Sequence, residues 1–283
     1  MKILITGANG LVGKACQEKA FALKYDTSIV SSKPPIYKDT SWYKSYSDIP
    51  SSALNNKYDL LIHAAAATPN NSPKESIYDL NISIDSDLLD FINLGNVKHI
   101  VYLSTMAIYG KINTKVINEN TPSNEPDSYG HSKLMGEELL LNSISDINSK
   151  LSIIRLPGVV GSTMPKVFFR RVYESILKGD QLTIRSAEAP FNNAVLDSDI
   201  FMTAINLLNN QVNKSLILNQ HSKDIITLGK FFELFSKILG KPALYSETME
   251  CNPPFLITNQ FNDNLLKTSR IATMIETFHE SIK

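Results

Sequence analysis

The sequence lacks the features that mark metal-binding, membrane-spanning or nucleic-acid-binding proteins. Its two cysteines, Cys16 and Cys251, lie too far apart in the chain to form a metal or redox motif, and Cys16 is expected to be a small buried residue. His63 stands apart from other potential ligands and is expected to pack or cap. No apolar run is long enough to cross a bilayer, and no N-terminal targeting pattern is present. Basic and acidic residues both number 28, so the chain has no general attraction to nucleic acid or to an anionic membrane. We therefore expect a cytoplasmic protein without a metal site and without a membrane or nucleic-acid partner.

The composition and the pattern of the chain are those of an α/β enzyme. Hydrophobic residues make up 43% and charged residues 20% of the 283 positions, ordinary values for a chain that is long enough to bury a full core. Strand-like runs alternate with segments of helical periodicity. The predicted strands are residues 2–6, 27–31, 58–68, 99–104, 181–185 and 215–219, and the predicted helices are residues 11–23, 73–94, 128–141, 164–178, 199–208, 228–239 and 269–282. This alternation predicts an α/β fold.

Residues 1–13, MKILITGANGLVG, predict a site for a dinucleotide. A short apolar run ends at Gly7, and glycine recurs at Gly10 and Gly13, where the pattern becomes helical. A buried strand, a tight glycine turn and a helix start together form an arrangement that cradles a pyrophosphate. An ordinary strand–turn–helix is the alternative, because the spacing is G-x-x-G-x-x-G rather than G-x-G-x-x-G. The residues assigned to cofactor binding here are Gly7, Asn9, Gly10, Leu11, Val12 and Gly13.

The residues that follow the second predicted strand, Ser31, Ser32 and Lys33, favour NADP over NAD as the cofactor. An NAD site usually carries an acidic residue here to bind the ribose hydroxyls, and this segment has none. Two hydroxyls and a cation suit the 2′-phosphate of NADP instead. The alternative is a solvated lysine in a turn that ends at Pro34-Pro35, and that interpretation leaves NAD open as the cofactor.

The predicted strand at residues 58–68 ends in a row of alanines that suits a flat cofactor. Small residues at the carboxyl end of a parallel strand let a ligand lie against the backbone, so Ala64, Ala65 and Ala66 are assigned to cofactor binding. Close packing of a helix on the sheet is the alternative, and both can hold. Asn81 interrupts the apolar face of the next helix and is assigned as a polar cofactor contact.

Tyr129 and Lys133 are a candidate catalytic pair. They are four residues apart, so they lie on one face of the predicted helix, and no other of the 11 tyrosines has a lysine at that offset. A tyrosine is a poor base at neutral pH because its ordinary pKa is about 10, and a neighbouring ammonium lowers that pKa by stabilising the phenolate. This suits proton exchange with a substrate hydroxyl or carbonyl group. Thr105, at the end of a predicted strand, is placed to hydrogen-bond the same oxygen, and a mere surface contact between Tyr129 and Lys133 is the alternative.

These motifs together resemble those of a known family. TGANGLVG, the HAAA strand end, Asn81, LSTMAIYG and YGHSK are similar, in this order and spacing, to the extended short-chain dehydrogenase/reductases, which include nucleotide-sugar epimerases, dehydratases and 4-keto reductases. The resemblance covers roughly residues 1–240. It implies a Rossmann doubly wound parallel sheet with a smaller C-terminal α/β substrate lobe. Residues 1–160 would form the dinucleotide-binding domain, segments near 190–220 would complete its sheet, and residues 161–283 would form mainly the substrate lobe.

The same resemblance implies an NAD(P)-dependent epimerase or 4-keto reductase that acts on a nucleotide sugar through Thr105, Tyr129 and Lys133. Tyr129 would exchange a proton while the nicotinamide exchanges hydride, and Lys133 would also hold the nicotinamide ribose. Tyr129, Lys133 and Pro157 are therefore counted among the cofactor contacts. GLVGKA and SSK look most like the GDP-sugar epimerase-reductase branch, which uses NADPH. Members often dimerise through helices like 79–94 and 129–142, which implies a homodimer.

Some positions depart from the family pattern. Dehydratases carry an acidic pair after the catalytic threonine, and this chain has Met106-Ala107, so elimination of water is not expected. Gly158 replaces the asparagine that contacts the substrate diphosphate, and Asn192 stands where an arginine is usual. These departures keep two alternatives open, a non-nucleotide carbonyl substrate and a non-catalytic NADP-binding regulatory protein. The implied substrate contacts are Thr68, Met106, Gly158 and Asn192. The candidate replacements for the missing phosphate contacts are Lys166, Arg170, Arg171 and Arg185, and a solvated helix face is the alternative for the first three.

Overall fold

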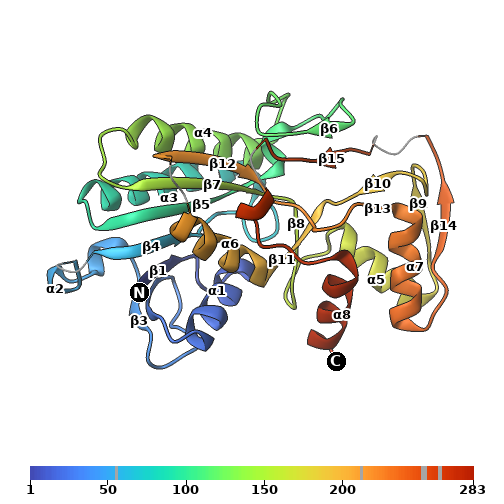
Figure 1. The fold of residues 1–283 in the computed structure, drawn as a ribbon, viewed down its shortest axis with the longest axis horizontal. Coiled ribbons are helices and arrows are strands. Elements are labelled where there is room, and N and C mark those ends of the chain that lie inside the picture. Colours follow the sequence, from blue (N-terminus) through green and yellow to red (C-terminus); the bar gives the residue numbers. More distant parts are fainter. Residues whose placement is uncertain (55–56, 211–212, 250–253, 261–262) are drawn as a thin grey trace.

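The largest unit of the protein is a sheet of seven parallel strands. The computed structural model describes residues 1–54, 57–210, 213–249, 254–260 and 263–283, so Cys251 lies outside the described residues (Figure 1). In spatial order the strands are β12 (Ser215–Asn219), β7 (Lys150–Leu156), β5 (Val97–Thr105), β4 (Tyr58–His63), β1 (Lys2–Thr6), β2 (Asp26–Val30) and β3 (Ser41–Tyr43). Every neighbouring pair is parallel. The predicted α/β fold with a doubly wound parallel sheet is confirmed.

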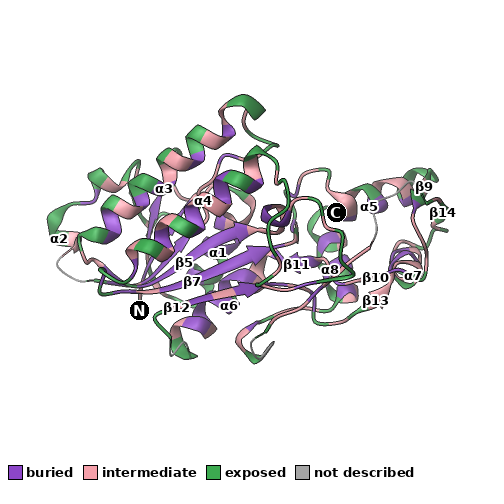
Figure 2. Ribbon diagram, turned by 90° about the horizontal axis from the view of Figure 1, so that it is seen from above, coloured by how far each residue is buried: buried purple, intermediate pink, exposed green. Residues whose placement is uncertain are grey.

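Helices cover both faces of this sheet (Figure 2). They are α1 (Leu11–Ala22) and α6 (Asp197–Asn210) on one face, and α3 (Ile77–Asn93) and α4 (Ser128–Ser143) on the other. Because both faces are covered, the strands are apolar without alternation. In β1, Ile3 and Ile5 belong to one core cluster and Leu4 belongs to the other, as the two-residue period of a strand requires.

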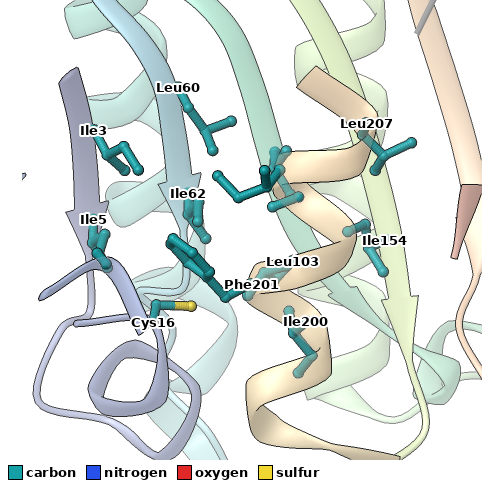
Figure 3. Packing of buried hydrophobic residues seen from close by; sticks show 14 of the residues in the cluster. Ile3, Ile5, Cys16, Leu60, Ile62, Leu103, Ile154, Ile200, Phe201 and Leu207 are labelled. Carbon is teal, nitrogen blue, oxygen red and sulfur yellow. The ribbon is translucent and has the colours of Figure 1, made fainter. Parts of the chain in front are cut away.

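The first core cluster packs α1 and α6 against the sheet. Phe201 of α6 and Cys16 of α1 lie with Ile5 and Ile62 of the neighbouring strands β1 and β4 (Figure 3). Cys16 is fully buried, and burial raises the pKa of its thiol, so it is the small inert core residue that was expected. This packing fixes the start of α1 against the carboxyl ends of the strands.

Most of the remaining elements form a smaller group at the other end of the molecule (Figure 1). It contains α5 (Phe168–Lys178), α7 (Leu228–Leu239) and α8 (Ile271–Ser281) with the strand pairs β9 (Gln181–Ile184) and β14 (Leu244–Glu247), β10 (Pro190–Phe191) and β13 (Ile226–Thr227), and β8 (Gly158–Val160) and β11 (Ala194–Leu196). Phe169, Phe231 and Phe235 stack edge to face at its centre, with ring centroids 4.9 to 5.5 Å apart. A further pair, β6 (Val116–Ile117) and β15 (Leu256–Ile257), and the short helix α2 (Ser51–Leu54) complete the elements named here.

Some predicted boundaries differ from the observed ones. The strand predicted at residues 58–68 ends at His63, and the backbone of Ala64 and Ala65 beyond it lies against Gly7. The helix predicted from residue 164 begins at Phe168, after Pro165. In the described part of the chain, none of the helices combines the length and the apolar character that a bilayer crossing needs.

Candidate functional site

The glycine turn after β1 has no room for side chains at two of its three glycines. Gly7 has a φ of +62°, and a Cβ on it would lie 2.5 Å from the carbonyl carbon of Ala64. A Cβ on Gly13 would lie 2.2 Å from the carbonyl oxygen of Gly7. Glycine is therefore required at both positions, and α1 can start directly against β1 and β4.

The start of α1 presents backbone N–H groups without a side-chain cap. Its N-cap is Gly10, which has no side chain to accept from the first turn. Leu11 and Val12 are partly exposed there. Uncapped N–H groups and the positive end of the helix dipole attract an anion, so this end suits a phosphate group.

A cavity of about 770 Å³ lies beside this turn. Its volume is within the usual range for a small-molecule or cofactor site. The predicted cofactor residues in its wall are Gly7, Ser31, Ser32, Ala65 and Ala66. Lys44 and Tyr46, which follow β3, and Asp87 and Asp90 of α3 also line it, and the sequence did not indicate them.

The loop after β2 differs in detail from the predicted phosphate site. Ser31 is buried, and its hydroxyl donates to the backbone oxygen of Lys33 at 2.6 Å. Asn9 accepts from the backbone nitrogen of Lys33 at 3.3 Å and donates to the oxygen of Pro34 at 3.4 Å. Ser31 and Asn9 therefore shape this loop. The cation that the structure places in the cavity wall is Lys44.

Asn81 links two elements behind the row of alanines. Its side-chain oxygen accepts from the backbone nitrogen of Ala67 at 2.7 Å, and its nitrogen donates to the oxygen of Ala67 at 3.0 Å and to Ser132 Oγ at 2.9 Å. The side chain is 1% exposed. The direct cofactor contact predicted for Asn81 is therefore corrected to a supporting role, because both hydrogens of the amide are used inside the protein.

Thr105 and Tyr129 meet at the carboxyl edge of the sheet. Thr105 ends β5, and its Oγ accepts from the backbone nitrogen of Ala107 at 3.2 Å. Tyr129 lies in the first turn of α4, where Asp127 accepts from the backbone nitrogen of Gly130 at 2.7 Å and caps the helix. Thr105 lies close enough to the Tyr129 hydroxyl to lower the pKa of Tyr129. Both side chains are partly exposed, so a substrate oxygen can reach them.

Lys133 lies one turn further along α4 and is fully enclosed. Its side chain is 1% exposed, and its Nζ lies 3.8 Å from the centre of the Tyr102 ring. Burial lowers the pKa of Lys133, while the carboxylates of Asp85 and Glu137 act in the opposite direction. The Lys133 ammonium is therefore buried, with the Tyr102 ring against it and the carboxylates of Asp85 and Glu137 nearby.

The prediction that Lys133 lowers the pKa of Tyr129 is wrong for the free protein. Burial raises the pKa of Tyr129 to about 12, and the nearby Thr105 side chain offsets only part of this effect. Lys133 does not offset this effect, because its ammonium packs against the Tyr102 ring.

A second pocket of about 290 Å³ lies next to Thr105. Its wall includes the predicted residues Thr105, Met106, Pro157 and Gly158, together with Ala107, Leu156, Asn193, Phe255 and Ile257. Thr68 lies in the turn after β4, where its backbone nitrogen donates to Asn71 Oδ1 at 2.7 Å.

Asn192 has a different role from the predicted substrate contact. It is fully buried, its Nδ2 donates to the oxygen of Ile257 at 2.8 Å, and its Oδ1 accepts from the nitrogen of Ile257 at 3.1 Å. The predicted substrate contact of Asn192 is therefore corrected, because its amide is used to hold β15 in place. Ile257 of β15 forms part of the pocket wall.

The sequence did not indicate two sets of buried ionisable side chains. Asp85 and His63 lie behind the first cavity, with Oδ1 and Nε2 3.3 Å apart. Glu137 and Arg155 form an ion pair between α4 and β7. No group of three or more histidine, cysteine or acidic residues with the geometry of a metal site occurs among the described residues.

Comparison with known proteins places these features in context. The model of the NAD dependent epimerase/dehydratase family matches residues 3–190. A UDP-glucose 4-epimerase of Lactobacillus helveticus is 27% identical over 177 residues, which cover 58% of this chain and 53% of that protein. A putative UDP-glucose 4-epimerase of Methanocaldococcus jannaschii is 30% identical over 173 residues, 56% of each chain. The matched region thus spans about half the length of these relatives.

The fold is shared with solved structures. The UDP-glucuronic acid 4-epimerase of Bacillus cereus in complex with NAD superposes with a TM-score of 0.80 at 20% identity, covering 100% of this chain and 97% of that one. A putative epimerase of Burkholderia cenocepacia superposes with a TM-score of 0.80 at 15% identity, covering 99% and 97%. At these identities the similarity concerns the fold.

Proposed function

The chain belongs to the NAD dependent epimerase/dehydratase family, as its resemblance predicted, and on this premise we propose that it is a nucleotide-sugar 4-epimerase with a bound nicotinamide dinucleotide. The observation that carries the proposal is the proximity of Tyr129 to Thr105. Thr105 lines a pocket at the carboxyl edge of the sheet, the edge that also holds the glycine turn. The relatives named above are 4-epimerases of UDP-sugars, which favours epimerisation over reduction.

The residues around the larger cavity fit a dinucleotide. Backbone atoms crowd the Cβ positions of Gly7 and Gly13, and the free N–H groups of α1 suit the pyrophosphate. Ala65 and Ala66 offer a flat wall for a ring. When bound, the nicotinamide supplies the removal and return of hydride at C4 of the sugar.

The reacting proton is assigned to Tyr129. Its Oη would take the proton of the 4-hydroxyl group as the C4–H bond breaks. It would return that proton to the same oxygen when hydride is returned to the opposite face of C4. Thr105 Oγ holds the same oxygen in place. Lys133 supplies the positive charge below Tyr129 on α4. Because burial raises the pKa of Tyr129 to about 12 in the free protein, the phenolate has to be stabilised once substrate and cofactor are in place.

The preference for NADP stays a prediction. Ser32 and Lys44 in the cavity wall suit a 2′-phosphate, whereas Asp87 and Asp90 in the same wall repel one. Several of the similar solved structures contain NAD. Titration of the purified protein with each dinucleotide, followed by calorimetry, compares the two dissociation constants directly.

The residues that contact the substrate phosphates are at other positions than is usual in the family. Gly158 is exposed at the pocket by Thr105, and Asn192 is fully buried. Of the candidate cations, Arg170 is bonded to Glu174 at 2.8 Å, while Lys166 and Arg171 are exposed. We assign the phosphate contact to Lys166 or Arg171. The predicted homodimer and cytoplasmic location stay predictions.

Turnover of sugar nucleotides tests the proposal. The purified protein is incubated with UDP-glucose, UDP-glucuronic acid or GDP-linked sugars, and the epimers are followed by proton NMR while absorbance reports reduced nicotinamide. Epimer formation without net loss of NADH or NADPH supports the proposal. Stoichiometric NADPH oxidation with 4-keto sugar nucleotides would instead identify a reductase. Dinucleotide binding without turnover of any nucleotide or non-nucleotide carbonyl compound would identify a regulatory protein.

A further inference from the structure

Four buried polar side chains lie between the larger cavity and helix α4. They are His63 of β4, Asp85 of α3, Tyr102 of β5 and Lys133 of α4, and each is at most 1% exposed. They come from four different elements of the sheet and its helices. Burying ionisable groups is costly unless their charges are balanced, so this cluster requires an explanation.

Tyr102 joins Asp85 to Lys133. Its hydroxyl donates to Asp85 Oδ2 at 2.7 Å, and its ring lies 3.8 Å from Lys133 Nζ, measured to the ring centre. A phenol that donates to a carboxylate has a more electron-rich ring, which strengthens its attraction for a cation. The three side chains therefore form one electrostatic unit.

Helix α4 has a glycine, Gly136, at the point where it packs against Asp85 and Tyr102. A Cβ on Gly136 would lie 2.2 Å from both Asp85 Oδ2 and the Tyr102 hydroxyl oxygen. Any larger residue would displace the carboxylate or the phenol. The space for the carboxylate is thus built into the helix that carries Lys133.

The other carboxylate near Lys133 already has a cation of its own. Glu137 binds Arg155 through two nitrogens, with Nη2 2.7 Å from Oε2 and Nε 3.1 Å from Oε1. His63 is neutral at neutral pH, because burial lowers its pKa. The charges then balance in pairs, Glu137 with Arg155 and Asp85 with Lys133.

We propose that Asp85 is the buried counter-ion of Lys133 and acts as a positioning residue, which keeps the ammonium charged below Tyr129. The catalytic consequence rests on the proposed function, in which Lys133 supplies that charge. His63 extends the unit to the cavity, since its Nδ1 lies 3.0 Å from Thr6 Oγ1 and 3.2 Å from the Tyr46 hydroxyl oxygen. Both of these side chains line the cavity.

The charge state of Lys133 depends on the groups that face it. These are Glu137 on its own helix, Tyr102 on β5, Asp85 on α3, His63 on β4 and, through Glu137, Arg155 on β7. Burial lowers the pKa of Lys133, and the negative charge of Asp85 is the first of the two effects that raise it. Removing that charge lets Lys133 lose its proton at a lower pH.

An NMR titration of Lys133 tests the proposal without substrate. The protein is labelled with [ε-¹³C]lysine, the Lys133 signal is identified by its absence in Lys133→Met, and the signal is followed from pH 6 to 11 in the wild type and in Asp85→Asn. The pKa of Lys133 is expected to fall by about 1–3 units in Asp85→Asn. Asp59→Asn, which removes a partly exposed carboxylate paired with Lys98, is expected to leave the pKa of Lys133 unchanged.

The wild-type titration is decisive even where Asp85→Asn fails to fold. A Lys133 that is neutral at pH 7 in the wild type would overturn the proposal, as would an unchanged pKa of Lys133 in a folded Asp85→Asn protein. Failure of the wild type to turn over any sugar nucleotide would count against the proposed function alone, because the titration reads Lys133 directly. Where turnover is found, the activity of Asp85→Asn is expected to fall, as the pH is raised, at a lower pH than the activity of the wild type. A purely structural defect would lower the activity equally at every pH.

Discussion

Arg155 on β7 and Glu137 on α4 form a buried ion pair with Nη2 2.7 Å from Oε2, and the same guanidinium donates to the Tyr109 hydroxyl at 2.9 Å. The Arg155 side chain is 8% exposed and that of Glu137 is 2% exposed. The pair therefore ties the helix that carries Tyr129 to β7, the second strand from one edge of the sheet. Loss of either partner leaves a buried charge without compensation.

Arg155→Met is accordingly expected to lower the free energy of unfolding by about 3–5 kcal/mol. Urea denaturation at pH 7 measures the change. Arg170→Met is the matched control, because it removes a partly exposed arginine paired with Glu174 and is expected to cost at most about 1 kcal/mol. Equal losses of unfolding free energy in the two variants would show that the buried pair contributes no more to stability than the partly exposed pair.

Gly13→Ala tests the glycine turn. Its new methyl group would lie 2.2 Å from the Gly7 oxygen, so α1 has to move away from β1, at a cost of about 1–3 kcal/mol in stability. We expect the thermal stabilisation by NAD or NADP to disappear. Gly158→Ala is the control, since its nearest neighbour would be 3.5 Å away, and it should keep that stabilisation. Retained dinucleotide binding in Gly13→Ala would argue against a site at this turn.

Tyr129→Phe tests the proton-transfer residue. The variant keeps the ring and loses the hydroxyl near Thr105, so kcat is expected to fall by about 10²–10⁴-fold while dinucleotide binding stays intact. Tyr245→Phe, at a tyrosine that is 36% exposed on β14, should keep full activity. Undiminished turnover by Tyr129→Phe would require another proton donor.

Asp197 is expected to make stability pH-dependent. Burial raises the pKa of this carboxyl from 3.8 to about 6, with nearby Glu18 and Asp199 adding to the effect. Between these values the unfolded chain releases the proton and the folded chain keeps it, so this group's contribution to stability is present below about pH 4 and is lost as the pH rises through 6.

Asp197→Asn should therefore raise the free energy of unfolding at pH 7.5, by about 3 kcal/mol at most, and change it little at pH 4. Urea denaturation at the two pH values measures the difference. The exposed Asp39→Asn is the control and should show no such pH dependence. An equal effect of Asp197→Asn at both pH values would contradict the assignment.

The bounds of a strand or helix could be predicted from the sequence where a local pattern determines them. The strand at residues 215–219 and the helix at residues 228–239 have their predicted bounds, because the first is a short apolar run and the second ends at Gly240 in the left-handed region. The glycine turn was predicted for the same reason, since its spacing is local.

Contacts between distant elements were beyond the reach of the sequence. Asp85 stands four residues after Asn81, so both lie on the buried face of α3, yet the partner of Asp85 is Tyr102 on another element. The helical spacing of Tyr129 and Lys133 predicted a shared face, but it did not show that the lysine packs on an aromatic ring. An acidic residue on an apolar helical face is the one signal that would have drawn attention to the cluster.

The wall of the pocket at Thr105 is completed by a segment made late in synthesis. Thr258, next to β15, bonds the oxygen of Ile117, which lies 141 residues earlier, and Asn192 holds Ile257 from the other side. On the ribosome, the glycine turn and Tyr129 emerge well before Phe255 does. The pocket at Thr105 can therefore be completed only after residues 255–257 have been made, long after the glycine turn and Tyr129.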